Sequence, residues 1–322
     1  MHRSRSAAIA LLLPLFFGHA SLNQAQAEDK LRVGKAIQNS FNFAMVDVGI
    51  ASGVFKANGL DVSPVNFTGA TRVQQALTSN DIDIGASTGQ DMGFEFKGLP
   101  AKAVGEISHK PYETEMLVKA DSTIKTVTDL KGKKVGVSNI RGYPSWLVIQ
   151  LSRHEGWGDD GMTLIATGSQ PASMAALRTR QIDAWPGDLG SGIEMTENHE
   201  ARVLLNFGDV VPPFVNTALF ASNTLIAQHP DLLRRFLKAW YENVAWVDSH
   251  KKETIDILVP TLNLKPDTVA KIYDQLMPTL STTGRFDPVA MKTMPSAIVQ
   301  LGILDSEPDL ATAYTEAYLP KP

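Results

Sequence analysis

The chain has 322 residues, a formal net charge of −4 and a pI near 6.0, and it contains no cysteine. The slightly acidic balance gives no electrostatic reason to bind nucleic acid or an anionic membrane surface. The lack of cysteine excludes disulfides, a thiolate nucleophile and a Cys-ligated metal. A chain of this length is long enough for two domains, each held together by its own hydrophobic core.

The first 27 residues have the pattern of a secretory signal peptide. Arg3 and Arg5 give a positive start, and 7–17 form an apolar run that is too short to span a bilayer. Ala25 and Ala27 then match an A-x-A cleavage site. We therefore expect export to the periplasm, with 28–322 as the mature protein.

The mature region begins with alternating β-like and helical runs. The sequence predicts strands at 31–36, 61–67, 81–86 and 101–107, and helices at 43–58, 71–78 and 90–97. Alternation of this kind is typical of a parallel sheet with helices on its faces. The sequence therefore indicates an α/β fold.

The same pattern then restarts. Strands are predicted at 135–137, 163–166 and 182–185, and helices at 145–154 and 171–178. Ala76-Leu77 followed by Ile82-Asp83 recurs 100 residues further on as Ala176-Leu177 followed by Ile182-Asp183. Equal spacing within matched elements favours a repeated α/β unit over chance, and thus two lobes of similar size.

The last third of the chain has a different character. After a strand at 215–221, helices are predicted at 225–248, 251–259, 266–277 and 288–301. Their apolar stripes need a sheet to cover, so we expect this tail to pack on the first lobe. Lobe I would then be 28–112 plus 216–322, and lobe II would be 113–215. The chain would cross between the lobes twice, near 111–116 and 213–217, which makes a hinge.

Polar turns follow the predicted strands of both lobes. In open α/β sheets, ligands bind beyond the carboxyl ends of the strands, where helix N-termini offer free N–H groups. Arg141 is expected to pair with a carboxylate or sulfonate, and Asp188 to take a cationic group or orient Arg141. Tyr143 and Trp185 are expected to stack on the ligand. The full candidate set is Asn42, Phe43, Thr68, Gly69, Ser87, Thr88, Ser138, Asn139, Arg141, Tyr143, Trp185, Asp188 and Asn216.

Several of these residues also have a purely structural interpretation. Thr88 and Asp91 fit a capping box, and Thr68 also suits the position before a helix. Arg141 could be solvated beside its turn. Trp185 fits a core position as well as a cleft rim. Asp47 could take a cationic group or simply be solvated on a helix face.

A catalytic alternative comes from residues 85–89. They match G-x-S-x-G between a strand and a helix, which is the setting of a hydrolase nucleophile such as Ser87. Only two strands precede the motif, no His-Gly-Gly-type segment lies upstream, and no later histidine follows a late strand. The histidines also lack metal-binding spacing, so we expect no catalytic residue, no metal and no cofactor.

Four stretches resemble a known family. They are GVFKANGLDV at 53–62, Ala76-Leu77 to Gly85, VTDLKGKKVGV at 127–137, and Ala175-Ala176-Leu177 to Ala184. These are similar to motifs of the periplasmic substrate-binding proteins of ABC importers for nitrate, sulfonate and taurine. Relatives in that family bind aromatic sulfonates or thiamin-precursor pyrimidines. The resemblance covers the whole mature chain and implies a two-lobed periplasmic-binding-protein fold (type II-like) with a hinge and a helical C-terminal tail.

The chain departs from the family pattern at four positions. Met45 stands where a proline is common, and Asp47 where an aromatic is common. Asn80 and Arg180 replace glycines before the two Ile-Asp pairs. Fungal pyrimidine synthases of similar fold carry a cysteine-rich motif, which a chain without cysteine cannot have.

The resemblance implies a monomeric receptor that closes on a ligand and passes it to a membrane permease driven by an ATPase. Convergent helix N-termini and Arg141 favour a small organic anion, such as a sulfonate or carboxylate. A nitrogen heterocycle, such as a thiamin-precursor pyrimidine between Tyr143 and Trp185, is the alternative. A secreted hydrolase using Ser87 and the sensory module of a signalling system are the alternatives of another class.

Overall fold

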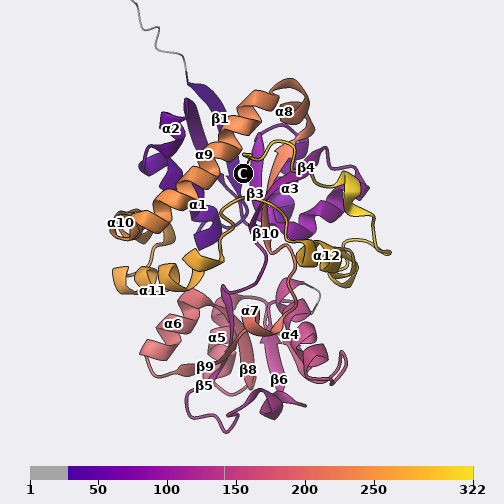
Figure 1. Ribbon diagram of the computed structural model, residues 1–322. Coiled ribbons are helices and arrows are strands. Elements are labelled where there is room, and N and C mark those ends of the chain that lie inside the picture. Colours follow the sequence, from indigo (N-terminus) through magenta and orange to yellow (C-terminus); the bar gives the residue numbers. More distant parts are fainter. Residues whose placement is uncertain (1–27, 141, 322) are drawn as a thin grey trace, which may run out of the picture.

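The computed structural model describes residues 28–140 and 142–321. Two five-stranded sheets, each flanked by helices, form two lobes that lie one above the other in Figure 1. This confirms the predicted α/β two-lobed fold. The predicted signal peptide, residues 1–27, lies outside the described residues. Within the described part of the chain, no helix combines the length and apolar character needed to cross a membrane.

The upper sheet has the strand order β2-β1-β3-β10-β4, and the lower sheet has the order β7-β6-β8-β5-β9. The upper strands are β1 (Asp29–Lys35), β2 (Leu60–Asn66), β3 (Ile84–Thr88), β4 (Ala101–Ser108) and β10 (Thr217–Ser222). The lower strands are β5 (Thr114–Lys119), β6 (Lys134–Val137), β7 (Thr163–Ala166), β8 (Ala184–Asp188) and β9 (Ala201–Asn206).

Helices surround both sheets. Those before β10 are α1 (Phe41–Ala51), α2 (Val54–Ala57), α3 (Ala70–Thr78), α4 (Tyr143–His154), α5 (Gln170–Arg178), α6 (Leu189–Glu197) and α7 (Phe207–Val210). Those after β10 are α8 (Asn223–Gln228), α9 (Pro230–Ser249), α10 (Lys251–Leu262), α11 (Pro266–Leu276) and α12 (Pro288–Gln300). Short 3-10 helices are η1 (Gly89–Lys97), η2 (Val127–Leu130), η3 (Met277–Thr279) and η4 (Leu310–Thr312).

The two sheets repeat one pairing scheme. In the upper sheet β1 pairs parallel with β2 and β3, while β10 pairs antiparallel with β3 and β4. In the lower sheet β6 pairs parallel with β7 and β8, while β5 pairs antiparallel with β8 and β9. The equivalent residues Asn80 and Arg180 both have left-handed φ values, 57° and 58°. That conformation favours glycine, which the family pattern has at both positions. Asn80 and Arg180 therefore keep the same backbone turn at the cost of some backbone strain.

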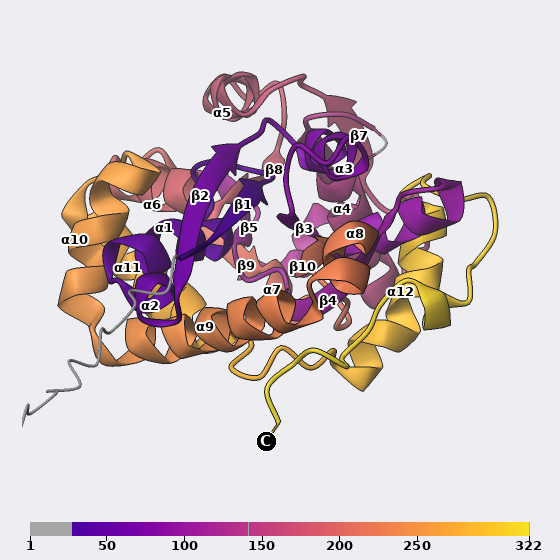
Figure 2. The same ribbon diagram turned by 90° about the horizontal axis from the view of Figure 1, so that it is seen from above.

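The helical tail packs on the upper lobe. Helix α9 runs along that lobe in both ribbon views (Figures 1 and 2). Its Phe236 ring stacks on Phe55 of α2, with ring centroids 5.6 Å apart, and Trp240 is fully buried. The backbone of Ala103 in β4 exchanges hydrogen bonds with Ala313 and Thr315. The exact lobe boundaries given above remain a proposal.

Two segments of chain connect the sheets side by side. The first links β4 to β5, and the second links α7 to β10. Phe214 N donates to His109 O (3.2 Å) and Asn216 N to Ser108 O (2.9 Å), so the two segments are bonded to each other. A pair of adjacent connections is the arrangement expected of a hinge.

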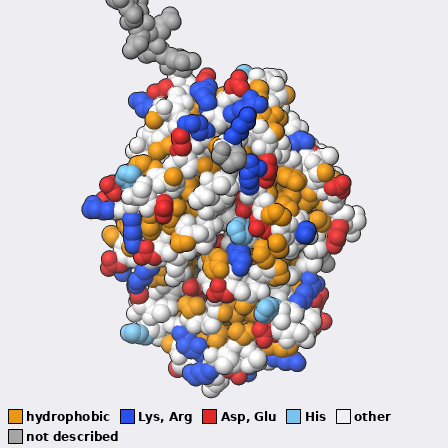
Figure 3. All heavy atoms as spheres, in the orientation of Figure 1, with side chains coloured by type: hydrophobic (Ala, Val, Ile, Leu, Met, Phe, Trp, Pro, Cys, Tyr) orange, Lys and Arg blue, Asp and Glu red, His pale blue; other side chains and the backbone are white. Residues whose placement is uncertain are grey.

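The tail also contacts the lower lobe on both flanks. Lys271 Nζ of α11 lies 2.5 Å from Glu197 Oε1 of α6. Gln300 Oε1 of α12 accepts hydrogen bonds from Trp146 Nε1 (2.9 Å) and Gln150 Nε2 (2.8 Å) of α4. On the face shown in Figure 3, basic and acidic side chains are interspersed over both lobes.

Gly89 offers a test of the contact between η1 and the second connecting segment. Its N–H donates to Asn216 O (3.1 Å), and a Cβ added there would lie 2.0 Å from Val215 O. We expect Gly89→Ala to lower the free energy of unfolding by about 1–3 kcal/mol, because backbone must shift to admit the methyl group. Urea denaturation measures this, with exposed Lys292→Ala as the control. A change within about 0.5 kcal/mol would contradict the close packing.

Candidate functional site

A cavity with a volume of about 460 Å³ lies between the lobes, and we call it the main cavity because residues of both lobes line it. The upper lobe contributes the turn before α1, and the lower lobe contributes the first residues of α5 and α6. The tail contributes the end of α10 and one face of α11. The lining residues are Ile37, Asn39, Ser40, Phe41, Glu113, Gln170, Asp188, Leu189, Gly190, Ser191, Glu194, Leu262, Leu264, Ile272 and Leu276.

One wall of this cavity is apolar and comes from the tail. Leu262 and Leu264 flank Asn263, which ends α10 in a left-handed conformation, and Ile272 and Leu276 follow on α11. Sequence reasoning missed this wall because it assigned the tail only to covering the upper sheet. The leucines on either side of the helix-ending Asn263 were the available signal, since such a turn directs both toward a neighbouring element.

A second cavity of about 230 Å³ adjoins the first and shares Gln170 and Asp188 with it. Its remaining lining residues are Thr114, Ser138, Tyr143, Pro144, Ser173, Trp185 and Pro186. The structure thus brings together four of the predicted site residues: Ser138, Tyr143, Trp185 and Asp188. Trp185 is only 4% exposed and packs with the core of the lower lobe, so it presents little surface to a ligand.

Tyr143 joins the lower lobe to both connecting segments. Its hydroxyl oxygen lies 2.8 Å from Asn216 Oδ1 and 3.2 Å from Glu113 Oε1. Asn216 Nδ2 donates to Glu113 Oε1 (3.0 Å) and to Ser108 Oγ (3.2 Å). Burial raises the pKa of the Glu113 carboxyl. Tyr143 and Asn216 were predicted site residues, whereas Glu113 was missed because it lies in a connecting segment rather than after a strand.

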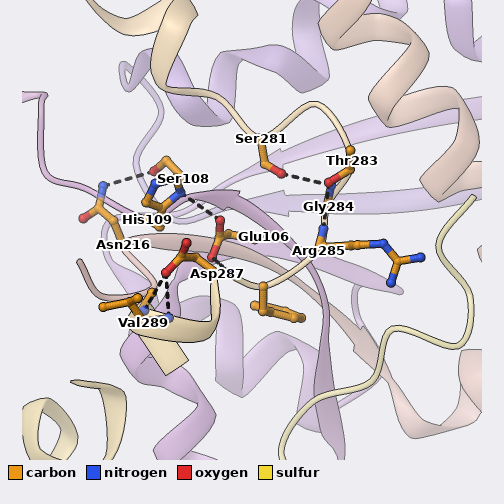
Figure 4. A network of polar contacts seen from close by, with 12 residues as sticks. Glu106, Ser108, His109, Asn216, Ser281, Thr283, Gly284, Arg285, Asp287 and Val289 are labelled. Atoms are coloured by element: carbon orange, nitrogen blue, oxygen red, sulfur yellow. Dashed lines mark hydrogen bonds and ion pairs between the residues drawn. The ribbon is translucent and has the colours of Figure 1, made fainter. Parts of the chain in front are cut away.

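Figure 4 shows a second set of polar contacts at the start of the first connecting segment. His109 Nδ1 lies 3.1 Å from Glu106 Oε1, and Asp287 N donates to Glu106 Oε2 (3.1 Å). Glu106 is 1% exposed, and its hydrogen bond with His109 raises the pKa of the imidazole. Asp287 in turn caps α12 by accepting from Val289 N and Ala290 N. The connecting segment is therefore anchored to the start of α12.

Asp47 pairs with a lysine that the sequence did not mark as buried. Lys35 is 1% exposed, and its Nζ lies 2.5 Å from Asp47 Oδ2. A buried ammonium needs such a partner. Asp47, which departs from the family pattern, therefore takes a cationic group, and that group belongs to the protein.

Ser87 requires a correction. It is fully buried and its Oγ donates to Asp91 Oδ2 (2.5 Å). Gln74 Nε2 (2.6 Å) and Thr88 Oγ1 (3.2 Å) bond the same carboxyl group, and burial raises the pKa of Asp91 to about 6. No histidine is among the described partners of Ser87. Ser87 therefore holds the start of η1 through Asp91, and it lines neither of the two cavities.

Other predicted residues also lie away from the two cavities. Asn42 (2% exposed) and Phe43 (1% exposed) are in the core, where Asn42 Nδ2 contacts Ser108 Oγ at 3.4 Å. Thr68 and Asn139 are exposed, Gly69 and Thr88 are half-buried, and none of the four lines either cavity. We selected these residues because ligands bind beyond the carboxyl ends of strands, but they line neither cavity. Arg141 lies outside the described residues.

Asp188 caps its own helix. Its Oδ1 accepts from Ser191 N (3.0 Å), and its Oδ2 accepts from Ser191 Oγ (2.9 Å) and Gln170 Nε2 (2.5 Å). Glu113, Asp188 and Glu194 all line the main cavity, and its described lining holds no Lys, Arg or His. Among residues 28–140 and 142–321, no group of three or more His, Asp or Glu is arranged to hold a metal.

A family model described as NMT1/THI5 like matches residues 40–254, which include both connecting segments and both sheets apart from β1. The chain belongs to the NMT1/THI5-like family. The first 39 residues and the end of the tail, including α11 and α12, lie beyond the matched part.

Proteins similar to this chain are named both as binding proteins and as enzymes. The "Putative aliphatic sulfonates-binding protein" of Bacillus subtilis is 25% identical over 77% of this chain and 74% of its own length. A 4-amino-5-hydroxymethyl-2-methylpyrimidine phosphate synthase of Saccharomyces cerevisiae, THI11, is 24% identical over 84% of this chain and 82% of its own. The crystal structure of the aliphatic sulphonate binding protein SsuA from Escherichia coli is similar with a TM-score of 0.76. It is 22% identical over 89% of this chain and 92% of that one, which shows a shared fold.

Glu115 of β5 is a buried carboxyl group next to this site. It is 6% exposed and so close to α6 that a Cβ at Gly192 would lie 2.5 Å from its Oε2. Burial, and secondly the charge of Asp188, raise its pKa to about 7. The ordinary pKa of a glutamate is 4.5, so between these two values the folded state holds a proton that the unfolded state has lost.

We accordingly expect stability to fall as the pH rises from about 4.5 to about 7, because the unfolded chain releases this proton first. In wild type, this group should lower the free energy of unfolding by roughly 3 kcal/mol between the two pH values, since one pKa unit corresponds to about 1.4 kcal/mol. Glu115→Gln should abolish this decrease. Denaturation at a series of pH values measures this, with exposed Glu253→Gln as the control. Parallel curves for wild type and Glu115→Gln would disprove it.

Proposed function

We propose that the protein is the solute-binding component of an ABC importer. It would capture a small molecule in the periplasm, as a monomer, and deliver it to a permease driven by an ATPase. The observation that carries this proposal is the cavity of about 460 Å³, because both lobes line it and two adjacent segments of chain connect their sheets. A ligand that contacts both lobes favours the closed form over the open one, and closure presents a new surface to a partner.

The ligand we favour is a small organic anion, such as a sulfonate or a carboxylate. Helix α1 begins at the cavity, its N-cap residue Ser40 makes no side-chain cap, and both Ser40 and Phe41 line the wall. Free N–H groups at a helix N-terminus suit an anionic oxygen. The aliphatic wall from α10 and α11 suits an alkyl or aryl body. The name of the Bacillus relative supports the same class, and Arg141 enters this proposal from the sequence alone.

A nitrogen heterocycle is the second candidate. Glu113, Asp188 and Glu194 line the cavity with no described base beside them, so the cavity offers acceptors for amino groups or protonated ring nitrogens. The pyrimidine in the name of the yeast relative supports this class. Tyr143, on the adjoining cavity, supplies an aromatic face.

A ligand screen separates the two candidates. Thermal shifts of the purified protein should follow RT ln(1 + [L]/Kd) for alkanesulfonates, carboxylates and aminopyrimidines. If an anion binds, we expect Arg141→Ala to weaken binding by about 10- to 100-fold, because a charge-assisted hydrogen bond is lost. If a heterocycle binds, Glu113→Gln should cause a loss of that size instead.

Matched controls are Arg72→Ala and Glu253→Gln, both at exposed positions. Binding of the best sulfonate that is unaffected by Arg141→Ala would rule out the anion assignment at its main residue. A screen in which no compound of any class raises the Tm would count against solute capture itself.

The absence of a reaction at Ser87 can be tested directly. We expect purified protein to hydrolyse p-nitrophenyl acetate no faster than buffer, and Ser87→Ala to give the same result, because the Ser87 hydroxyl is buried against Asp91. A spectrophotometric assay of nitrophenol release measures this. Turnover that disappears in Ser87→Ala would establish the hydrolase alternative.

A further inference from the structure

The two cavities at the lobe interface differ in character. The smaller one has polar and aromatic walls, with Ser138 and Tyr143 among them. The larger one has an aliphatic wall, with Leu264 and Ile272 among its residues. Their volumes of about 230 and about 460 Å³ mean that most of the space lies on the aliphatic side.

Gln170 stands between them. It is the first residue of α5, it lines both cavities, and its side chain is exposed rather than packed. Its amide Nε2 donates to Asp188 Oδ2 (2.5 Å) and to Ser191 Oγ, both on α6 or its N-cap. The amide therefore spans from the start of one helix to the start of the next, at the place where the two cavities meet.

This bridge can open without breaking the other hydrogen bonds at the start of α6. Asp188 and Ser191 remain bonded to each other without Gln170, through Ser191 N (3.0 Å) and Ser191 Oγ (2.9 Å). Water can replace the amide on both groups because the side chain is exposed. Gln170 and Asp188 both line the two cavities and are hydrogen-bonded to each other, so a ligand that reaches from one cavity into the other comes into contact with this bonded pair.

We propose that Gln170 is a specificity-determining residue that selects ligands by length. Short ligands occupy one cavity, and longer amphipathic ligands displace the Gln170 amide and occupy both, with an alkyl or aryl chain against Leu264 and Ile272. This inference rests on the proposed function and adds to it a bipartite ligand, with a polar head and an apolar body. Each methylene buried against the aliphatic wall should improve the affinity by about fourfold.

The test compares linear alkanesulfonates from methanesulfonate to octanesulfonate. Isothermal titration gives the ratio of the Kd for methanesulfonate to that for octanesulfonate, in wild type and in Gln170→Ala. We expect this ratio to rise about tenfold in Gln170→Ala, because the long chain no longer has to displace the amide. Leu264→Asn should lower the ratio, since it makes the aliphatic wall polar. Gln181→Ala, at an exposed position beyond the far end of α5, is the control.

An equal ratio in wild type and Gln170→Ala overturns the inference while leaving solute capture intact. If no sulfonate binds to the wild type, the anion assignment fails, and 1-octanol, which has no charged head group, then tests the cavity. Saturable shifts of the Leu264 and Ile272 methyl signals in NMR spectra, larger in Gln170→Ala than in wild type, support the inference. Shifts that are absent or equal in the two proteins overturn it.

Discussion

The hydrogen bonds of the Tyr143 hydroxyl to Asn216 and Glu113 join the lower lobe to the two connecting segments. The relative position of the two lobes depends on these segments. The two segments are already bonded to each other through the backbone, so a single side chain of α4 reaches both. The group that receives this contact, Glu113, also lines the main cavity. A ligand that changes the surroundings of Glu113 therefore acts directly on the connection between the lobes.

Buried ionisable groups concentrate around these connections and the adjacent sheet edges. Glu106 and Glu115 lie at the two ends of the first connecting segment, one in each sheet. Lys35 of β1 pairs with Asp47 of α1, and Asp91 of η1 is bonded by Ser87 of β3, so each has a side-chain partner on its own lobe. Removing such groups from water costs free energy, which local pairing offsets for Lys35 and Glu106, whereas Glu115 avoids the cost by keeping its proton up to about pH 7.

Much of the fold could be predicted from the sequence because it rests on periodicity. The repeat of Ala-Leu and Ile-Asp 100 residues apart corresponds to the same turn in both lobes, down to the left-handed Asn80 and Arg180. The site was harder to predict. The rule that ligands bind at strand ends found Ser138, Tyr143 and Asp188, but it could not tell a turn whose side chain faces the cavity from one that turns inward, as at Ser87.

Residues contributed by distant elements escaped that rule altogether. Glu113 belongs to a connecting segment, and Leu264 belongs to a tail whose contacts with the lower lobe are fixed only by tertiary packing. No local pattern encodes which helix of the tail reaches across the interface. A local pattern, such as the helix-ending Asn263 between two leucines, can be assigned to the cavity only when the positions of both lobes are known.

The hydrogen bond from Trp146 to Gln300 makes tryptophan fluorescence sensitive to the distance between the lobes. The indole is 3% exposed, its N–H ends on a side chain of the opposite lobe, and its ring lies 4.6 Å from that of Phe214 in the second connecting segment. If the lobes separate, as the proposed function requires, the indole exchanges that acceptor for water, and the Trp146 part of the emission shifts to the red. Comparison with a Trp146→Phe variant then distinguishes this signal from that of the other four tryptophans.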